Sequence, residues 1–296
     1  MEKFIGPMRP WPTLIDYGEF VKLTQSKATV FYYDSGQSDK PNLILIHGLG
    51  DDADTWRHLF IPLSERFRVI ALDLPGFARS EKPSRIYSLS YLRDTVLEMM
   101  EMLNLGNADL MGNSLGAMIA EAIAIKYPDK ITGLTLLDGT LTTPVFSYHH
   151  FLLLMALPFL GKRSYDDLRT KPKEAYENLR LFYANLDNLP EPDRQFLYQR
   201  VNERIWNEKQ RDAFLSILHQ LVWRLPFLRP YFVFRIAKLG IPIHVVWGEQ
   251  DLVIPVKVAY RLTKLQPAAK LTVLPGIGHI PQQENPEAVM QAMLKR

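Results

Sequence analysis

The sequence predicts an α/β fold in which a mostly parallel sheet is flanked by helices and a helical block is inserted late in the chain. Short apolar runs that end in Gly or Asp alternate with stretches of helical length, and this alternation stops between residues 141 and 239. Continuous apolar runs are typical of strands that are buried on both faces of a parallel sheet. Strand–helix alternation indicates the α/β class, here with one interruption by helices alone.

The individual elements follow from the periodicity of apolar residues. Residues 17 to 34 alternate apolar and polar side chains, which predicts an antiparallel hairpin at an edge of the sheet. Buried strands are expected within 42–48, 67–76, 108–114, 131–139, 241–251 and 269–279. Helices are expected within 51–66, 89–104, 115–127 and 256–265, and from residue 286 onward. The predicted organisation is a core made of residues 1–140 and 240–296 and a helical cap made of residues 141–239.

Composition argues against several classes of function. The 296-residue chain carries 35 basic and 32 acidic residues, scattered along it, whereas nucleic-acid binding needs a concentrated basic face. It has no cysteine, which excludes disulfides, thiolate metal sites and a cysteine nucleophile. The longest apolar run, residues 151–160, is too short to span a bilayer and includes Pro158. Because no apolar segment of signal-peptide length precedes the first prolines, we expect a cytoplasmic location.

The segment GNSLG lies between a predicted strand and a predicted helix. A sharp strand-to-helix turn exposes the residue at its apex, and small residues at Gly112 and Gly116 let strand and helix approach closely. The helix that follows directs free N–H groups and its positive dipole end at the same point. Ser114 is therefore the candidate nucleophile, and the N–H group of Leu115 is a candidate hydrogen-bond donor beside it.

A serine nucleophile needs a base, and the base needs a carboxylate that orients it. His279 follows the last predicted strand, and Asp251 follows the strand before it. Ligand-binding loops gather at the carboxyl ends of parallel strands, so we expect both residues to lie beside Ser114. The order serine, aspartate, histidine along the chain is one of the known orders of a catalytic triad.

A second loop completes the candidate site. The run LILIHGLG ends a predicted strand at His47 and continues through Gly48, Leu49 and Gly50. The two glycines permit a close backbone approach, so that the N–H group of Leu49 can pair with that of Leu115 and bind an oxyanion. His47 is expected to support this loop rather than to take part in the chemistry.

With these parts in place, the chain resembles the α/β-hydrolase superfamily. The matching segments are HGLG, VIALDLPGFARSEKP, GNSLGA, LLDG, VVWGEQDLVIP and PGIGHIPQQENP, and they occur in the family order. The resemblance implies an eight-stranded, mostly parallel sheet, a helical cap over the active site and no cofactor. Serine at position 114 distinguishes the chain from epoxide hydrolases and haloalkane dehalogenases, which carry aspartate there.

Two further points concern the acid and metal binding. Asp138 follows the strand at 131–137, where some superfamily members carry their acid, and it is the alternative to Asp251. Asp251 is preferred because WGEQD matches the commoner family position.

No metal is expected, since the adjacent His149 and His150 should point apart on a helix and no carboxylate cluster accompanies them.

The helical block is expected to lie above Ser114 and to line a substrate pocket with some of its apolar side chains, while most of them form its own core. The candidates are Phe146, Phe151, Phe159, Trp223, Phe227 and Phe232. An apolar lining predicts an apolar acyl or aryl substrate.

The sequence therefore predicts a serine hydrolase that cleaves carboxylic esters through an acyl-enzyme. Two alternatives stay open. The GNSLG turn is also similar to that of the meta-cleavage C–C bond hydrolases, although their oxyanion loop usually continues with Pro-Gly, whereas here Gly50 precedes Asp51 and Asp52. A small-molecule receptor on the same fold can retain the complete set of residues.

Overall fold

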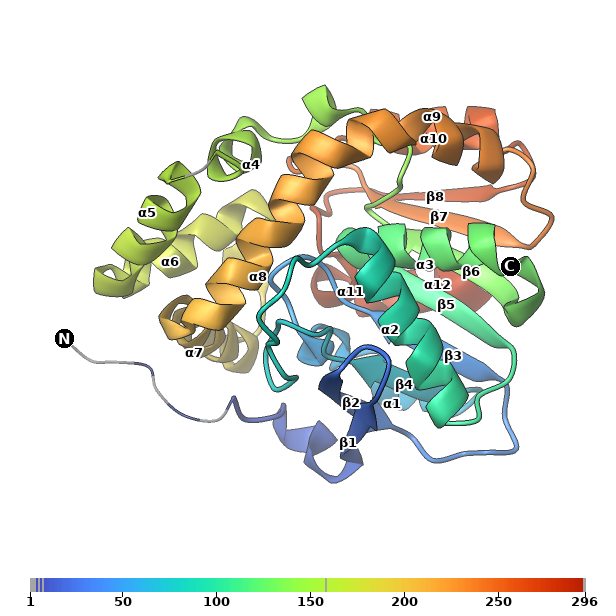
Figure 1. Ribbon diagram of the computed structural model, residues 1–296, viewed down its shortest axis with the longest axis horizontal. Coiled ribbons are helices and arrows are strands. Elements are labelled where there is room, and N and C mark those ends of the chain that lie inside the picture. Colours follow the sequence, from blue (N-terminus) through green and yellow to red (C-terminus); the bar gives the residue numbers. More distant parts are fainter. Residues whose placement is uncertain (1–3, 5, 7, 158, 295–296) are drawn as a thin grey trace.

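The computed structural model describes residues 4, 6, 8–157 and 159–294, apart from the side chain of Phe146. One eight-stranded sheet has the order β1-β2-β4-β3-β5-β6-β7-β8 (Figure 1). The strands are β1 (Gly18–Leu23), β2 (Ala28–Asp34), β3 (Asn42–Ile46), β4 (Arg68–Leu72), β5 (Ala108–Asn113), β6 (Ile131–Leu137), β7 (Ile243–Gly248) and β8 (Lys270–Leu274). Strand β2 pairs antiparallel with β1 and β4, and the other pairs are parallel. The predicted sheet and its edge hairpin are confirmed.

Helices cover both faces of this sheet. They are α1 (Phe60–Ser64), α2 (Leu89–Met102), α3 (Leu115–Lys126), α10 (Lys257–Leu265), α11 (Pro281–Glu284) and α12 (Pro286–Leu294). Four of the predicted helices correspond to α2, α3, α10 and α12. The helix predicted within 51–66 is divided, because the Asp52 side chain accepts the Asp54 N–H and caps a separate 3₁₀ turn at Ala53–Trp56, ahead of the short α1.

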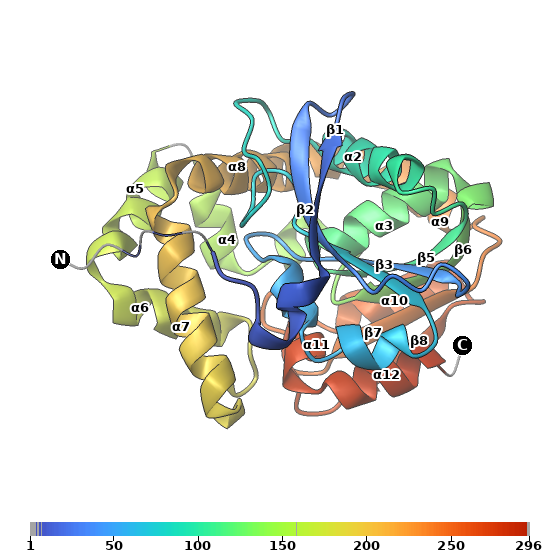
Figure 2. The same cartoon turned by 90° about the horizontal axis from the view of Figure 1, so that it is seen from below.

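The sheet is buried on both faces because successive side chains of a strand point to opposite sides. In β3, Leu43 and Leu45 pack in one apolar cluster with side chains of α1 and α12. Ile44 and Ile46 pack in a second cluster with side chains of α2 and α3. Figure 2 shows the corresponding helices on the two sides of the sheet. The continuous apolar run of this strand is thereby explained.

Between β6 and β7 the described residues form helices and turns only. The helices are α4 (His150–Met155), α5 (Leu160–Asp167), α6 (Pro172–Glu177), α7 (Glu191–Trp206), α8 (Glu208–His219) and α9 (Leu225–Ile236), and a π-helical turn at Gln220–Arg224 joins α8 to α9. Figures 1 and 2 show α4 to α8 as a group beside the sheet, whereas α9 runs back along α3. None of the helices among the described residues is both long and apolar enough to cross a membrane.

A buried carboxyl group fastens α3 to the chain that follows β6. The Oε2 atom of Glu121 accepts hydrogen bonds from the Thr140 hydroxyl and from the Leu141 N–H, both at 2.8 Å. The residue has no exposed surface. Burial raises the pKa of Glu121 to about 7, although these two hydrogen bonds favour the charged form.

This raised pKa makes stability depend on pH. In the unfolded chain a glutamate has a pKa of about 4.3, so the contribution of Glu121 to stability is fully present below that pH and is lost as the pH rises through about 7. We expect the free energy of unfolding of the wild type to fall, relative to Glu121→Gln, by roughly 2 to 3 kcal/mol between about pH 5 and pH 8. Urea unfolding of both proteins at the two pH values measures this difference, and an equal pH dependence would contradict it.

Candidate active site

Ser114 occupies a strained turn between β5 and α3. Its backbone has φ 53° and ψ −113°, in the left-handed half of conformational space that side chains other than glycine rarely occupy. The turn is held because the Ser114 N–H donates to the Leu137 carbonyl oxygen at 2.8 Å. A Cβ atom at Gly112 would lie 2.2 Å from the carbonyl carbon of Gly116, and one at Gly116 would lie 2.0 Å from the Ile46 oxygen. Only glycine fits at these two positions.

The loops after β7 and β8 bring two further predicted residues to this turn. The Nε2 atom of His279 lies 2.9 Å from Ser114 Oγ, and its Nδ1 atom lies 2.7 Å from Asp251 Oδ2. The other oxygen of Asp251 accepts the N–H groups of Val253 and Ile254 at 2.7 and 2.9 Å. Both carboxylate oxygens are thus engaged, so the carboxylate is fixed toward the imidazole. We call Ser114, His279 and Asp251 the Ser–His–Asp row.

The position of His279 depends on a residue that the sequence analysis missed. The Nδ2 group of Asn113 donates to the His279 carbonyl oxygen at 3.0 Å, and the His279 N–H donates to the Phe182 oxygen at 2.7 Å. Asn113 directly precedes the serine within the recognised GNSLG segment. The sequence analysis also missed Gly139, although this residue lies within the segment LLDG. A Cβ atom at Gly139 would lie 2.3 Å from the backbone carbonyl oxygen of Ser114.

Asp138 lies near this row but does not orient the imidazole. Its Oδ1 atom accepts the Gly248 N–H at 2.8 Å, and the residue is fully buried. Burial and the adjacent Asp251 carboxylate raise the pKa of Asp138 well above its usual range. The two acids are therefore distinguished by their surroundings: Asp251 accepts hydrogen bonds from N–H groups at both oxygens, whereas Asp138 accepts one, from Gly248.

The loop after β3 borders the serine turn. His47 is buried, its Nδ1–H donates to the Gly48 oxygen at 2.7 Å, and its Nε2 accepts the Leu74 N–H at 2.9 Å. Burial lowers the pKa of His47, so the ring is a neutral support of the loop. A Cβ atom at Gly48 would lie 3.4 Å from Ser114 Cβ, and Gly50 has φ 79°. Gly50 thus has a backbone conformation that favours glycine, whereas the nearest atom to a Cβ at Gly48 would be the Asn113 side-chain oxygen, at 3.1 Å.

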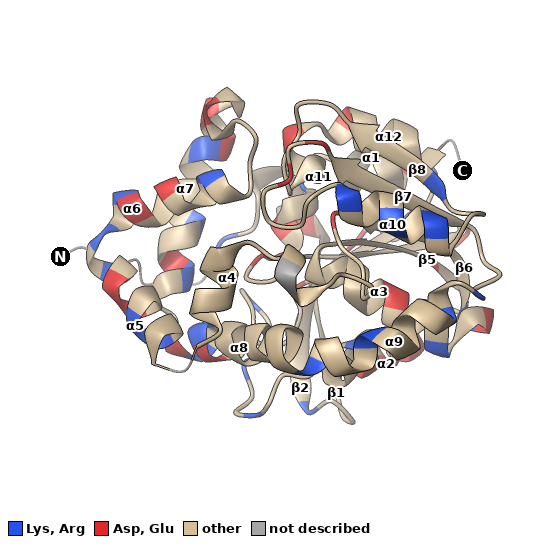
Figure 3. Cartoon of the chain, turned by 90° about the horizontal axis from the view of Figure 1, so that it is seen from above, with Lys and Arg blue, Asp and Glu red and all other residues tan. Residues whose placement is uncertain are grey.

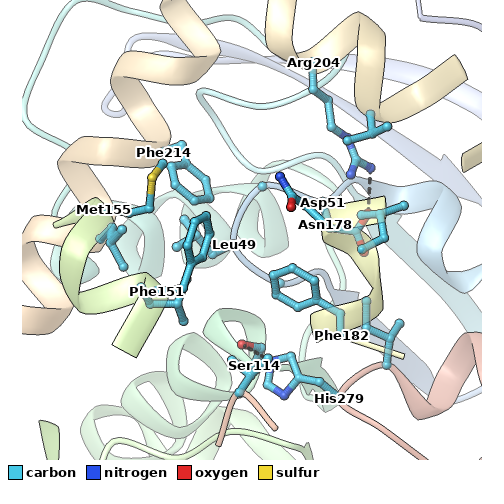
Figure 4. A pocket seen from close by; sticks show the side chains of 18 of the residues that line it. Leu49, Asp51, Ser114, Phe151, Met155, Asn178, Phe182, Arg204, Phe214 and His279 are labelled. Atoms are coloured by element: carbon cyan, nitrogen blue, oxygen red, sulfur yellow. Dashed lines mark hydrogen bonds and ion pairs between the residues drawn. The ribbon is translucent and has the colours of Figure 1, made fainter. Parts of the chain in front are cut away.

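Leu49 and Leu115 carry the two predicted oxyanion donors. Leu49 follows Gly48 in this loop and lines the same pocket as Ser114 (Figure 4). Leu115 is the first residue of α3, whose opening N–H groups have no partner within the helix. The backbone N–H groups of both residues thus belong to the two segments that meet at the serine.

The pocket above Ser114 is lined mainly by apolar side chains of the helices and turns between β6 and β7 (Figure 4). They include Phe151, Leu152, Met155, Phe182, Phe214, Leu218, Leu221 and Val222. Of the six aromatic residues predicted for the lining, Phe151 is present. The prediction is wrong for Phe232, which is buried in the main core, and for Phe159, Trp223 and Phe227, which are 90, 48 and 85% exposed. The side chain of Phe146 lies outside the described part of the chain.

One side of the pocket carries an ion-pair cluster that links α7 to the loop after β3. The Nη2 atom of Arg204 lies 2.7 Å from Asp51 Oδ1 and 2.7 Å from Asp52 Oδ2. Arg200 Nη2 lies 2.9 Å from Asp54 Oδ2. Burial disfavours charge on Asp52, yet Arg200 and Arg204 hold its pKa below the usual range. The guanidinium that reaches the pocket is therefore already neutralised.

Two clusters were considered as metal sites. The rings of His149 and His150 lie 4.1 Å apart, so the expectation that they point away from each other is wrong. The reason is that His149 is the N-cap residue of α4, with ψ 137°, and does not share the helical geometry of His150. Among the described residues, the one group with metal-ligand spacing is Asp138, Asp251 and His279. Asp251 and His279 of this group belong to the Ser–His–Asp row and are hydrogen-bonded to each other.

Comparison with known proteins agrees with the fold described above. A family model for the α/β-hydrolase fold matches residues 41–286. The chain therefore belongs to the α/β-hydrolase fold family.

The proteins similar to this chain carry different names. It is 27% identical over 280 residues to the 2-hydroxy-6-oxononadienedioate/2-hydroxy-6-oxononatrienedioate hydrolase of Burkholderia vietnamiensis, with 90% of each chain covered. A solved Acinetobacter baumannii protein, named as a candidate lipase, matches with a TM-score of 0.77 and 25% identity over 94% of this chain and 89% of that one. A thermophilic esterase from Thermogutta terrifontis matches with a TM-score of 0.75 and 22% identity over 94% and 97%.

The ion-pair cluster can be tested by removing one partner. Arg204→Met removes the guanidinium that contacts the carboxylates of both Asp51 and Asp52. We expect this substitution to lower the free energy of unfolding by about 3 to 5 kcal/mol. The matched control is Arg163→Met, because Arg163 is 83% exposed and lies 4.0 Å from Asp167. The control should cost less than about 1 kcal/mol. Urea unfolding measures both, and equal losses would contradict the prediction.

Proposed function

We propose that this protein is a serine hydrolase that cleaves carboxylic esters with an apolar acyl or aryl group. The observation that supports this most directly is the Ser–His–Asp row, with distances of 2.9 and 2.7 Å at the base of an apolar pocket. Both distances are hydrogen-bond lengths, which is the reach that proton transfer from the hydroxyl to the imidazole requires.

The reaction follows from the protonation of the row. Asp251 accepts the Nδ1–H of His279, so the lone pair of Nε2 faces Ser114. The serine oxygen attacks the ester carbonyl carbon as Nε2 takes its proton. The N–H groups of Leu49 and Leu115 bind the resulting oxyanion, and one such donor is worth about 3 kcal/mol. His279 then protonates the leaving alcohol, and a water deprotonated by the same ring releases the acid from the acyl-enzyme.

In this proposal residues 141–239 act as a cap over a core of residues 1–140 and 240–296. The support is the lining of the pocket, in which Phe151 and Phe214 of the helical group face Ser114 and His279 of the strand loops (Figure 4). A cap of this kind excludes water from the acyl group and strengthens the electrostatic interactions at the reacting carbon.

The pocket favours a neutral substrate. Its charged lining residues besides the histidine of the Ser–His–Asp row are Asp51 and Arg204, and the guanidinium of Arg204 already contacts two carboxylates. A carboxylate on the substrate would be buried without a free cation, which is costly.

Hydrolysis of a C–C bond is the second candidate, because the Burkholderia vietnamiensis relative is a hydrolase of a dioate by name. The neutral lining makes the ester the better fit.

We expect Ser114→Ala to lower kcat for p-nitrophenyl butyrate by a factor of about 10⁴ or more, because no other group supplies the nucleophile. The matched control is Ser90→Ala, an exposed serine of α2, which should retain wild-type activity. A fluorophosphonate should label the wild type on the peptide that contains Ser114, as identified by mass spectrometry, and should not label Ser114→Ala. Full activity of Ser114→Ala would refute the assignment.

Kinetic measurements on the wild type and on Ser114→Ala distinguish ester hydrolysis from C–C bond hydrolysis. A graded panel of esters is compared with a meta-cleavage ring-fission product by kcat/KM. The proposal expects short and medium apolar esters to be turned over faster than the charged ring-fission product. The reverse order would favour C–C hydrolysis, and negligible turnover of every substrate would favour the receptor alternative.

The roles of the two buried acids make a further prediction. We expect Asp251→Asn to lower kcat by a factor of about 10⁴, because an amide cannot hold the imidazole in the required tautomer. Asp138→Asn should change kcat by less than about tenfold, since an amide resembles the protonated acid in shape and in its ability to donate. Steady-state kinetics with p-nitrophenyl butyrate measures both. A larger loss in Asp138→Asn than in Asp251→Asn would exchange the two roles.

A further inference from the structure

The outer face of α9 and of the turn before it is apolar. Trp223, Phe227, Tyr231 and Phe234 are 48, 85, 52 and 57% exposed. Their spacing of three or four residues places them on one side of the helix. The other side carries Phe232 and other buried side chains that pack in the main core. A surface helix usually exposes polar residues opposite its buried face, so α9 is unusual in being apolar on both sides.

The end of α4 and the start of α5 extend this surface. Phe159 is 90% exposed and Leu160 is 50% exposed. The Trp223 indole N–H donates to the Ala156 oxygen at 3.3 Å, which joins the last turn of α4 to the turn before α9. We call Phe159, Leu160, Trp223, Phe227, Tyr231 and Phe234 the apolar face. Contiguous exposed apolar surface of this kind marks a site of interaction rather than ordinary solvent-exposed surface.

Positive charge flanks the part of the apolar face that lies on α9. Residues 213–248 contain no Asp or Glu, and Figure 3 shows bands of Lys and Arg along α9 without an acidic one. Arg224, Arg235 and Lys238 are exposed. The Lys238 ammonium lies 4.0 Å from the ring centre of Phe234, and the Arg235 guanidinium lies 6.0 Å from that of Tyr231. Aromatic rings beside cations suit the boundary between the headgroups and acyl chains of a bilayer.

We propose that the apolar face docks the protein on the surface of an anionic lipid bilayer. The exposed rings would enter the interface while Arg224, Arg235 and Lys238 meet the lipid phosphates. A second copy of the chain fits this face less well, because a two-fold contact through the same patch would bring these cations against one another. The inference concerns binding, and it goes beyond the proposed function.

Docking would bring the pocket close to lipid. Leu218, Leu221 and Val222 line the pocket from the same helical segment whose outer side carries Trp223. The wall between the pocket and the apolar face is thus one helix thick at this point. If the proposed esterase function holds, the bilayer is the source from which apolar esters reach Ser114.

Vesicle flotation with the full chain tests the proposal. We expect binding to vesicles of phosphatidylcholine with about one-third phosphatidylglycerol, and weaker binding to phosphatidylcholine alone. Raising the salt to about 1 M, where the screening length falls to about 3 Å, should weaken the binding to the anionic vesicles. The triple variant Phe159→Ser, Phe227→Ser, Phe234→Ser should lower the partition coefficient about tenfold or more. Arg224→Glu with Lys238→Glu should lower it on anionic vesicles only.

Three controls make the outcome decisive. Phe20→Ser changes a residue of β1 that is 60% exposed, on the side of the molecule opposite α9, and should bind as the wild type does (Figure 1). The triple variant should keep the wild-type kcat/KM on a short soluble ester, which shows that it is folded. Ser114→Ala should bind vesicles normally, so that failure of docking and failure of the proposed function are distinguishable.

The proposal is overturned if the wild type does not float with anionic vesicles, or if the triple variant floats as well as Phe20→Ser. It is also overturned if light scattering shows a wild-type dimer that the triple variant abolishes while no vesicle binding occurs. In that case the apolar face is a contact between copies of this chain.

Discussion

The left-handed turn at Ser114 is the constraint on which the rest of the site depends. A serine in that conformation is costly, and it is kept because strand, helix and the chain after β6 close on it from three sides. Gly112, Gly116 and Gly139 leave no room for a side chain, since a Cβ atom at any of them would lie within 2.3 Å of backbone atoms. The same closeness presents the N-terminus of α3 and the loop after β3 to one point. The strained backbone of Ser114 and the tight packing around it therefore depend on each other.

Much of this arrangement could be predicted because it depends on short, local sequence patterns. The spacing of the glycines in GNSLG and HGLG indicates turns whose backbone requires glycine. Apolar runs such as that of β3 identify a sheet that is buried on both faces. The two residues that complete the Ser–His–Asp row are 137 and 165 positions from the serine, but each follows a strand of the same parallel sheet, so topology alone places them together.

What could not be predicted depends on how separate elements pack. The aromatic residues of the helical block look alike in sequence, yet Phe151 faces the pocket whereas Phe159 and Phe227 face outward, because the direction of each side chain is set by neighbouring helices. The pairing of Arg200 and Arg204 with the acids of the loop after β3 spans about 150 residues and leaves no local pattern. The contact between the rings of His149 and His150 arises because a helix begins between them.

The ion pairs between α7 and the loop after β3 distinguish one wall of the pocket from the other. Leu49 belongs to the loop whose Asp51 and Asp52 contact Arg204, so a shift of α7 would also move the Leu49 backbone relative to Ser114. The opposite wall, formed by α4 and α8, is held by apolar contacts that include Met155 and Leu218. The two walls of the pocket are therefore held differently: charged contacts fix the wall beside Leu49, and non-directional apolar contacts hold the wall formed by α4 and α8.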